Sequence, residues 1–546
     1  MLGNQPPGLY ILALANTGER FGYFTVLSVF LLYLQAKFGF DASVSGQIYA
    51  SFMAVVYFMP IIGGIVADKW SFSKCVGTGM VVMGIGYLVV AVPTPIYSTS
   101  ALVVLVCGLL LVSIGTGLFK SNLQVMIGDL YNSPRYSAQR DSGYSIFYMA
   151  INLGAMFAPA AATWATNMAL SADGFIYVNA MPGLCTEYLA GSESAATAIA
   201  SLAADSGMSM GAGVGDFASR YLTALSQGYG YSFAVAFASI AASALIYYLG
   251  RGTYAHISHT VKHASADSTE ASELTPQQTR SRIVSLLMVM AVVIFFWMVF
   301  MQSGATLTEF AKCCTTPTPG GWTRVGFNVW VLLAISVGVY AIIGMAHSKR
   351  AVYKIVSGAV LLCSVAAVVY LYASTPDPLT DVQPQDYQQF NGFFIIVLTP
   401  ISLALFGWLA SRRSEPSAPR KIGYGMIMAA VSYAVLMIGS FGIKGTQAAV
   451  SGNWLIGTYL LLTVSELLLS PMGISFVSKV APPKYKGIMM GCWFGSTAIG
   501  NYLVAIPMIL WGKIPVWTVW AILAALCVLS ATVIFLIMRR LEEVEV

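Results

Sequence analysis

The chain has 546 residues, of which 57% are hydrophobic and only 9% are charged. A soluble domain carries about a quarter charged residues, so this composition excludes a soluble globular protein and is typical of a polytopic membrane protein. The formal net charge of +6 gives no indication of nucleic-acid binding, and we expect a lipid bilayer as the surroundings. The first apolar segment lacks a basic leader and contains Glu19 and Arg20, so we expect no cleavable signal peptide.

About fourteen apolar segments are long enough to cross a membrane as helices, which takes about twenty residues each. About six precede a polar loop and about eight follow it, so the sequence predicts an all-α membrane protein. The segments are 8–36, 44–67, 75–93, 99–119, 143–169, 229–250, 282–311, 326–346, 351–373, 388–411, 421–443, 453–478, 487–511 and 515–538.

The distribution of basic residues predicts the orientation. With both termini in the cytoplasm, about twenty Lys and Arg lie in cytoplasmic loops and about six lie outside, which is a positive-inside bias. We therefore expect a multi-pass protein of the cell (inner or plasma) membrane with cytoplasmic N- and C-termini. Residues 251–281 then form a cytoplasmic linker, and 170–228 form an outer insertion in which 186–205 has a helix-like composition.

Two charged residues lie inside the first apolar segment. Asn16, Arg20, Tyr23 and Leu27 form one stripe at helical spacing, with Glu19 beside it. Charge is costly in the lipid core and normally faces a bundle interior or a wet cavity on a substrate or ion path. The stripe therefore predicts one wall of a polar cavity, and the alternative is a Glu19–Arg20 pair that neutralises itself in helix packing.

The second segment ends in a glycine pair followed by charge. Gly63 and Gly64 would let two helices approach closely, and Asp68, Lys69 and Lys74 follow at the cytoplasmic end. An Asp among basic residues suits a gate made of breakable ion pairs, and it resembles the loop signature of the major facilitator superfamily. A merely solvated loop end is the alternative.

Further polar residues lie in later segments. Lys120 is a second cation, Tyr148 and Asn152 share a helix face, and Glu466 places a carboxylate in the middle of a late segment. Two cations from the first half, Arg20 and Lys120, then face one anion from the second half. This arrangement complements a zwitterion, and binding to both halves would pull them together.

At these residues the chain resembles the proton-dependent oligopeptide transporters, a family of the major facilitator superfamily. The resemblance covers much of both halves, and it runs through Glu19-Arg20-Phe21, the segments of Lys120 and Asn152, Ser465 to Pro471, and the segment of Trp493. It implies two six-helix bundles that work by alternating access, and proton-coupled uptake of di- and tripeptides by a protein that is not an enzyme.

The resemblance also implies roles for single residues that meet the two ends of a peptide. Arg20 and Lys120 would meet the carboxylate of the peptide, and Glu466 would meet its terminal ammonium. Glu19 would form a switchable ion pair with Lys120.

Four other residues would complete the pocket under the same resemblance. Asn152 and Asn391 would hydrogen-bond the peptide backbone. Tyr23 and Trp493 would line the pocket, where aromatic walls accept varied side chains through contact area.

The chain departs from the family pattern at several positions. Asn16 replaces an acid, Phe24 replaces the second Tyr of a pair, and Leu27 replaces an Arg found in bacterial relatives. Met301 occupies the region in which the family carries an acid on helix seven, so Leu27 and Met301 are a matched loss that strands neither charge.

These losses leave fewer proton sites. We hypothesise that Glu19, and secondarily Glu466, carries the proton, because a carboxylate couples protonation to its pairing with a cation or an amine. Glu309 is either a third coupling site or a surface acid. Protons are the only coupling partner expected, with no cofactor and no metal; His256, His259 and His263 are interpreted as a solvated loop.

The resemblance also divides the chain into domains. Residues 1–250 form the N-terminal bundle and 282–325 the first helix of the C-terminal bundle. Residues 326–373 are an inserted hairpin expected to pack outside the core, and 388–546 complete the C-terminal bundle.

Three cysteines share the outer side. Cys185 pairs with Cys313 or Cys314 in a disulfide, or all three are free thiols. Their spacing does not decide between these alternatives.

Three other functions remain open at this point. The chain could transport another small zwitterion or organic anion, because the altered positions change the pocket. It could also be a peptide-sensing membrane receptor without turnover. A membrane enzyme is disfavoured because the sequence shows no nucleophile–base constellation.

Overall fold

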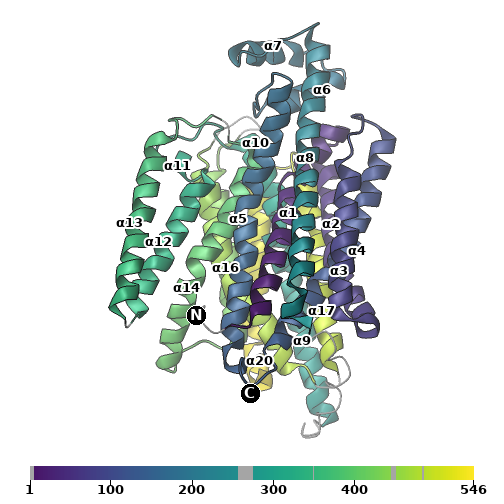
Figure 1. The fold of residues 1–546 in the computed structure, drawn as a ribbon. Helices are drawn as coiled ribbons and strands as arrows, with labels where there is room; N and C mark the ends of the chain where they lie inside the picture. The colour runs from purple at the N-terminus through teal and green to yellow at the C-terminus, as the bar shows by residue number, and fades with distance from the viewer. Residues whose placement is uncertain are drawn as a thin grey trace.

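The structure is a computed structural model that describes residues 5–255, 275–348, 350–380, 382–443, 450–482 and 485–545. His256, His259 and His263 lie outside these residues. Fourteen helical segments of the described chain are long and apolar enough to cross a membrane, which confirms the predicted all-α class and the expected number of spans. Figure 1 shows them as a bundle of long, roughly parallel helices.

The N-terminal half is a six-helix bundle. In it, α1 packs against α5 and α8, while α4 packs against α2 and α3. The helices are α1 (Pro7–Phe38), α2 (Ala42–Trp70), α3 (Phe72–Ala91), α4 (Thr99–Leu130), α5 (Arg140–Ala172) and α8 (Val214–Leu249). A 3₁₀ turn precedes α5 (Ser137–Gln139) and another follows α8 (Gly250–Thr253).

One glycine of the expected pair allows two of these helices to touch. A Cβ atom at Gly63 would overlap the carbonyl group of Gly117 in α4, whereas nothing lies within 4 Å of a Cβ at Gly64. The Asn122 side chain of α4 also donates a hydrogen bond to the Gly63 carbonyl at 3.2 Å. Close approach of α2 and α4 therefore depends on Gly63.

An insertion between α5 and α8 projects from one end of the bundle (Figure 1). It contains α6 (Met181–Leu189) and α7 (Ala195–Asp205). We call this the outer end, following the predicted orientation, and both chain-end markers in Figure 1 lie toward the opposite, inner end.

The sixth span begins earlier than expected, at Val214 rather than at 229. Asp216, Arg220 and Gln227, together with several Gly, Ser and Thr residues, lower the hydropathy of its first turns, which hid them in the sequence. Phe217 is nevertheless buried and packs on Phe175 at a ring-centroid distance of 5.5 Å. The helix therefore extends beyond the predicted span into the range 170–228.

The C-terminal half is the second bundle. Its seventh span is interrupted, so α9 and α10 are two parts of one crossing. The helices are α9 (Pro276–Phe300), α10 (Thr306–Cys314), α14 (Gln389–Ser411), α15 (Ala418–Gly439), α16 (Asn453–Val480), α17 (Lys486–Leu503), α18 (Ala505–Leu510), α19 (Val516–Leu536) and α20 (Met538–Glu545).

A hairpin lies between α10 and α14 in the chain. It consists of the short α11 (Gly321–Val325) followed by α12 (Val329–His347) and α13 (Ala351–Ser374). Figure 1 shows α12 and α13 at one flank of the bundle, where α12 lies closer to α14. The hairpin therefore packs beside the two bundles, as expected from the sequence.

Two helices of the N-terminal half meet the C-terminal half. α2 contacts α17 and α18, and α5 contacts α14. The space between these contacts positions the candidate site.

Candidate functional site

A cavity of about 180 Å³ lies between the two halves. Its walls come from both bundles and combine aromatic, amide and carboxylate side chains. The lining residues are Phe24, Leu27, Tyr49, Met53, Tyr57, Tyr148, Ile151, Asn152, Ala155, Pro159, Trp297, Phe300, Met301, Ser303, Gln388, Asn391, Gly392, Ile395, Tyr459, Leu462 and Glu466.

Glu466 is the carboxylate of this cavity, and its hydrogen bonds come from both halves. Asn391 of α14 donates to Oε2 of Glu466 at 3.2 Å, and the Tyr148 hydroxyl of α5 donates to Oε1 at 3.5 Å. Asn391 also donates to Oγ1 of Thr463 at 3.2 Å. The described residues give Glu466 neutral donors and no cationic partner, so its charge is available to a cationic group in the cavity.

Asn152 lies on the opposite wall of the cavity. Its Nδ2 donates to the Tyr148 carbonyl at 2.9 Å, which holds the amide one turn above that carbonyl. The predicted sharing of a helix face by Tyr148 and Asn152 is confirmed, because both line the cavity. The three predicted residues Asn152, Asn391 and Glu466 are therefore together.

Glu19 and Arg20 form a buried ion pair beside the cavity. Arg20 Nε lies 2.5 Å from Oε2 of Glu19, and Nη2 donates to Oε1 at 3.0 Å. Glu19 is only 1% exposed and Arg20 only 6% exposed. The expected pair between Glu19 and Lys120 is not the one formed here: Arg20 takes that place.

Lys120 stands over an aromatic ring of the cavity wall. Its Nζ lies 4.0 Å from the ring centroid of Tyr57, a cation–π contact. Tyr57 lines the cavity, whereas Arg20 and Lys120 are not among its lining residues. Arg20 instead lies 5.1 Å from the ring centroid of Tyr23, so neither of the two predicted cations forms the wall itself.

Tyr23 and Trp493 also lie outside the cavity lining. The Tyr23 hydroxyl donates to the sulfur of Met53 at 3.3 Å, and the Trp493 ring packs where a Cβ on Gly473 would lie. Both side chains are 2% exposed. In this conformation they support cavity residues and neighbouring helices from behind.

Several cavity residues were not singled out in the sequence. Tyr57, Tyr459 and Gln388 line the cavity, but nothing in an apolar segment distinguishes one aromatic residue that faces a cavity from another that faces lipid. Leu27 and Met301, identified as a matched apolar replacement, both line the same cavity. Their positions therefore make this part of the wall apolar.

The seventh span is broken beside the cavity. Met301–Gly304 is a 3₁₀ turn between α9 and α10, and Ser-Gly sequences are common at such kinks. Side chains of neighbouring helices satisfy the carbonyls at the break: Tyr433 donates to Val299 at 2.7 Å, and Tyr459 donates to Ser303 at 3.4 Å. The break is therefore a hydrogen-bonded part of the structure.

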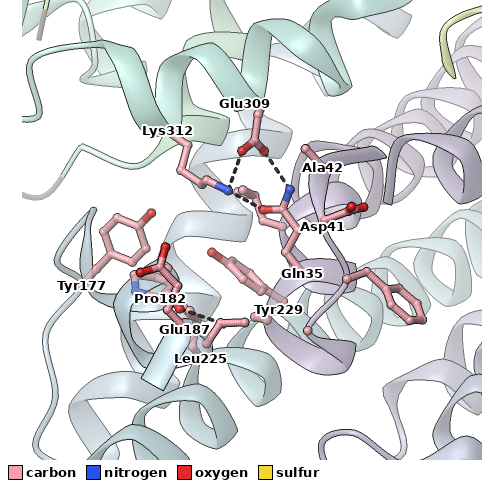
Figure 2. A pocket seen from close by; sticks show the side chains of 16 residues that line it. Gln35, Asp41, Ala42, Tyr177, Pro182, Glu187, Leu225, Tyr229, Glu309 and Lys312 are labelled. Carbon is pink, nitrogen blue, oxygen red and sulfur yellow. Dashed lines mark hydrogen bonds and ion pairs between the residues drawn. The ribbon is translucent and has the colours of Figure 1, made fainter. Parts of the chain in front are cut away.

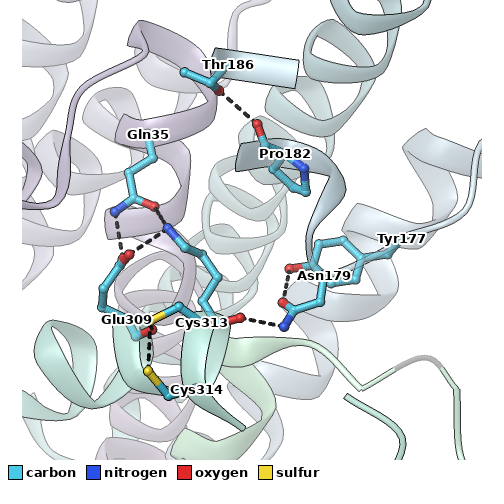
Figure 3. A network of polar contacts seen from close by, with 9 residues as sticks. Gln35, Tyr177, Asn179, Pro182, Thr186, Glu309, Cys313 and Cys314 are labelled. Atoms are coloured by element: carbon cyan, nitrogen blue, oxygen red, sulfur yellow. Dashed lines mark hydrogen bonds and ion pairs between the residues drawn. The ribbon is translucent and has the colours of Figure 1, made fainter. Parts of the chain in front are cut away.

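A second polar cluster joins the halves nearer the outer end (Figures 2 and 3). Gln35 of α1 donates to Glu309 at 2.8 Å and accepts from Nζ of Lys312 at 2.6 Å. Lys312 Nζ also lies 2.7 Å from Oε1 of Glu309. We call these three residues the outer knot. Glu309 is only 6% exposed, so it is not a surface acid, which was one of the two alternatives for this residue.

Further hydrogen bonds between the halves lie close to the outer knot in sequence and space. Asn179, which precedes α6, donates to the Lys312 carbonyl at 2.5 Å (Figure 3). Gln388 donates to the Ser28 carbonyl of α1 at 3.1 Å, and within its own half it also donates to Thr308 at 2.9 Å. The halves are thus held together on the outer side of the cavity.

A second cavity, of about 310 Å³, lies outside the outer knot. Figure 2 shows Tyr177, Tyr229 and Glu187 around it, opposite Glu309 and Lys312. Because Glu309 and Lys312 are also members of the knot, this cavity and the knot form one region.

The glycine–aspartate motif lies at the inner ends of α2 and α3. Lys69 is in the last turn of α2 and Lys74 in the first turns of α3, and both are exposed. The side chain of Asp68 is outside the described part of the structure. The proposed ion-pair gate at this motif stays a prediction.

All eight cysteines are free thiols. Cys185 is buried in α6, and Cys313 lies 3.2 Å from Cys314 between sulfur atoms. Of the two alternatives for the outer side, the structure shows free thiols.

Comparison with known proteins identifies the family. A family model described as the POT family matches residues 73–270 and 359–517 of this chain, which is more than half of its length. The chain belongs to the POT family.

Curated relatives match over nearly the whole chain. The uncharacterized transporter YclF of Bacillus subtilis (strain 168) is 25% identical over 525 residues, which cover 94% of this chain and 89% of that protein. Dipeptide and tripeptide permease A of Escherichia coli (strain K12) is 24% identical over 531 residues, covering 92% and 85%.

A solved structure confirms the fold. The crystal structure of the peptide transporter POT in complex with sulfate has a TM-score of 0.68 and 19% sequence identity, and covers 100% of this chain and 96% of that chain. The likeness supports the arrangement of two bundles at this level of identity.

Proposed function

We propose that this POT family member is a secondary active transporter that takes up di- and tripeptides together with protons by alternating access. The family membership and the printed function of the E. coli permease support this proposal. The observation that carries it is Glu466, a cavity carboxylate that accepts hydrogen bonds from α5 in one half and α14 in the other.

In this proposal Glu466 binds the terminal ammonium of a peptide. A charge-assisted hydrogen bond from an ammonium is stronger than those from the neutral Tyr148 and Asn391 donors, so the substrate replaces at least one of them. Asn152 and Asn391 then hydrogen-bond the peptide backbone. Because these residues belong to both halves, the substrate itself links the halves as the cavity closes.

The carboxylate of the peptide is assigned to Lys120 and Arg20. Neither cation lines the cavity, and Lys120 lies against Tyr57, so the Tyr57 ring moves aside before the carboxylate reaches Lys120. Lys120 forms no ion pair with a described residue, and its cation–π contact is weaker than a charge-assisted bond to a carboxylate. Lys120 is therefore the first of the two cations to meet the substrate.

Proton coupling is assigned first to Glu19 and second to Glu466. Protonation of Glu19 removes its attraction to Arg20 and frees that guanidinium for a substrate carboxylate. Loss of the proton restores the Glu19–Arg20 pair and releases the carboxylate. Glu309 joins this scheme at the outer knot, where protonation weakens the link between α1 and α10.

We place the protein in the cell membrane with its termini in the cytoplasm, because the basic residues favour that orientation. The outer knot then closes the outer side in the present conformation. Outward opening requires the bonds of Gln35 to Glu309 and Lys312 to break, since they join opposite halves.

The test is uptake of a labelled dipeptide into proteoliposomes with and without an inward proton gradient. Accumulation only with the gradient is the expected result. Equilibration that ignores the gradient would instead assign a facilitator, and binding without uptake would assign a peptide-sensing receptor.

Another small zwitterion or an organic anion is the second candidate substrate. Leu27 and Met301 make one wall of the cavity apolar, and Phe24 lacks the hydroxyl of the family Tyr. Competition of unlabelled amino acids, organic anions and dipeptides against the labelled dipeptide distinguishes these substrates. The dipeptides are expected to compete at the lowest concentrations.

A further inference from the structure

A groove of about 560 Å³ separates the hairpin from the transport core. Leu153 of α5 and Ile396 of α14 form its core wall, and Tyr340 of α12 with Val356 and Val360 of α13 form its hairpin wall. These residues all lie within membrane-spanning segments. The groove is therefore an apolar space at the depth of the lipid chains.

The hairpin is fastened to the core mainly toward its outer end and its middle. Trp330, in the first turn of α12, packs edge-on against Phe157 of α5 with 5.5 Å between ring centroids. The Tyr340 hydroxyl donates to the Ile396 carbonyl at 3.2 Å. Only 6% of the most apolar stretch of α13 is buried, so most of this helix faces the surroundings of the protein.

Cations lie directly below the groove, at the inner turn of the hairpin. Arg350 occupies the N-cap position of α13 without a side-chain capping hydrogen bond, and Lys354 lies less than one helical turn from the groove residues Val356 and Ser357. Both side chains are exposed, and neither forms an ion pair with a described residue. His347, the other titratable group described at this turn, contacts the Ile343 carbonyl of its own helix through Nδ1 at 3.2 Å.

A second apolar groove in the same protein provides a comparison for the charges at the rim of the hairpin groove. That groove, of about 600 Å³, lies between α15 and α19. Its inner rim carries Arg420, which pairs with Glu542 at 2.7 Å. A hydrogen bond from Ser417, together with Arg420, lowers the pKa of Glu542, so this acid is ionised at neutral pH.

Other acids lie among the basic residues of that rim. Lys421 pairs with Glu415, and Arg539 and Arg540 are followed in α20 by Glu542 and Glu543. Apolar volume is thus common to both grooves, but acids lie among the basic residues of the second rim, whereas the described residues of the hairpin turn, 347–348 and 350–357, include no acid.

We propose that the hairpin groove binds an anionic phospholipid of the inner leaflet, with its phosphate at Arg350 and Lys354 and its acyl chains between the hairpin and the core. Basic clusters at the cytoplasmic ends of membrane helices attract anionic headgroups, and chain-length apolar walls accept the tails. The lipid fills the part of the interface where α13 has little protein contact. It thereby becomes part of the attachment of the hairpin.

Native mass spectrometry of the full-length purified protein, titrated with phosphatidylglycerol or with phosphatidylcholine of the same chains, tests this proposal. We expect the tightest-bound lipid to be phosphatidylglycerol. In the double variant Arg350→Gln/Lys354→Gln, its affinity falls about five-fold for each cation removed. Val360→Trp, which fills the groove, lowers binding of the tightest lipid without changing any charge.

The matched control removes two cations from the other groove, as Arg539→Gln/Arg540→Gln. The control variant is expected to bind phosphatidylglycerol as the wild type does. An equal loss in the control and in the hairpin variant would overturn the proposal, as would equal affinity of the wild type for the two lipids. A dimer that Val360→Trp converts to monomer would assign the groove to a second copy of the chain and would also overturn it.

Discussion

Glu19–Arg20 and Glu309–Lys312 are both buried ion pairs between residues close in sequence, yet they relate differently to the two halves of the molecule. The first pair lies entirely on α1, and no other half is needed to complete it. The second pair on α10 shares both of its charged groups with Gln35 of α1. A pair within one half persists when the halves move, whereas a cluster across the halves must come apart.

This difference separates two tasks that sequence alone does not distinguish. In the proposed function, the Glu19–Arg20 pair sets how much charge is presented near the cavity, and it would respond to protons and substrate. The outer knot sets which side of the cavity is closed, because its bonds exist only when α1 and α10 are together. Glu466 differs from both ion pairs, because its hydrogen-bond donors, Tyr148 and Asn391, are neutral.

The largest effect is expected when Arg20 is removed. Arg20→Met leaves Glu19 buried without its partner, and breaking a buried pair in this way costs about 3–5 kcal/mol. Thermal unfolding of the purified protein should show a large loss of stability. The double variant Glu19→Gln/Arg20→Met should recover most of it, and equal instability of the two variants would show that the pair is not the cause.

Glu19→Gln should abolish proton-driven accumulation while leaving peptide exchange across the membrane. The amide keeps the shape of the side chain but has no ionisable proton at physiological pH. Uptake driven by acidification and counterflow exchange are measured in the same proteoliposomes. Unchanged accumulation would remove Glu19 from coupling and leave Glu466 or Glu309 as the proton site.

Glu466→Gln should weaken binding of ordinary dipeptides about ten-fold or more, because a hydrogen bond to a charged group contributes about 1.5–3 kcal/mol. Peptides with a blocked amino terminus carry no ammonium and should lose much less. The KM values of the two peptide classes are compared in wild type and variant. Equal losses for both would mean that Glu466 does not recognise the ammonium.

Much of the fold could be predicted because helix length, hydropathy and the positions of Lys and Arg are local properties of the sequence. The fourteen spans and the hairpin between the seventh and eighth core helices are of this kind, whereas the grouping of Asn152 with Glu466 was expected only from the resemblance to a known family. The start of α8 was missed because Asp216, Arg220 and Gln227 lower the hydropathy of its first turns. Its buried face exists only once the outer insertion folds over it.

The candidate site was harder to predict because it depends on which side chains meet across the halves. Gln35 and Glu309 are 274 residues apart, and neither carries a motif, so the outer knot leaves no pattern in the sequence. The choice of Arg20 over Lys120 as the partner of Glu19 likewise depends on rotamers. The position of Tyr57 between Lys120 and the cavity has the same origin.

A smaller effect is expected from Gln35→Leu, which removes the α1 member of the outer knot and keeps the Glu309–Lys312 pair. Losing these hydrogen bonds should shift the equilibrium toward outer opening by about 1 kcal/mol. Spin labels at Glu193 and Trp322, in a background with Cys107→Ser and Cys363→Ser, would report a larger population of long distances. An unchanged distance distribution would show that the knot does not hold the outer side closed.

The smallest effect is expected from Arg220→Gln. Arg220 pairs with Asp216 at 3.7 Å on the same outer end, but both side chains are about half exposed and both lie on α8. An exposed pair within one helix contributes about 0.3–0.5 kcal/mol. The spin-label distances should therefore match those of the wild type, which makes this variant the control for Gln35→Leu.

The 3₁₀ turn at Met301–Gly304 has a mechanical consequence. It divides the seventh span into the long inner helix α9 and the short outer helix α10, which carries Glu309 and Lys312. The hydroxyls of Tyr433 and Tyr459 already donate to the backbone carbonyls at this break. For this reason α10 can change its angle to α9 without exposing unbonded backbone to lipid. The outer side of the cavity can then open by movement of α10, which has nine residues, while α9 stays packed against α17.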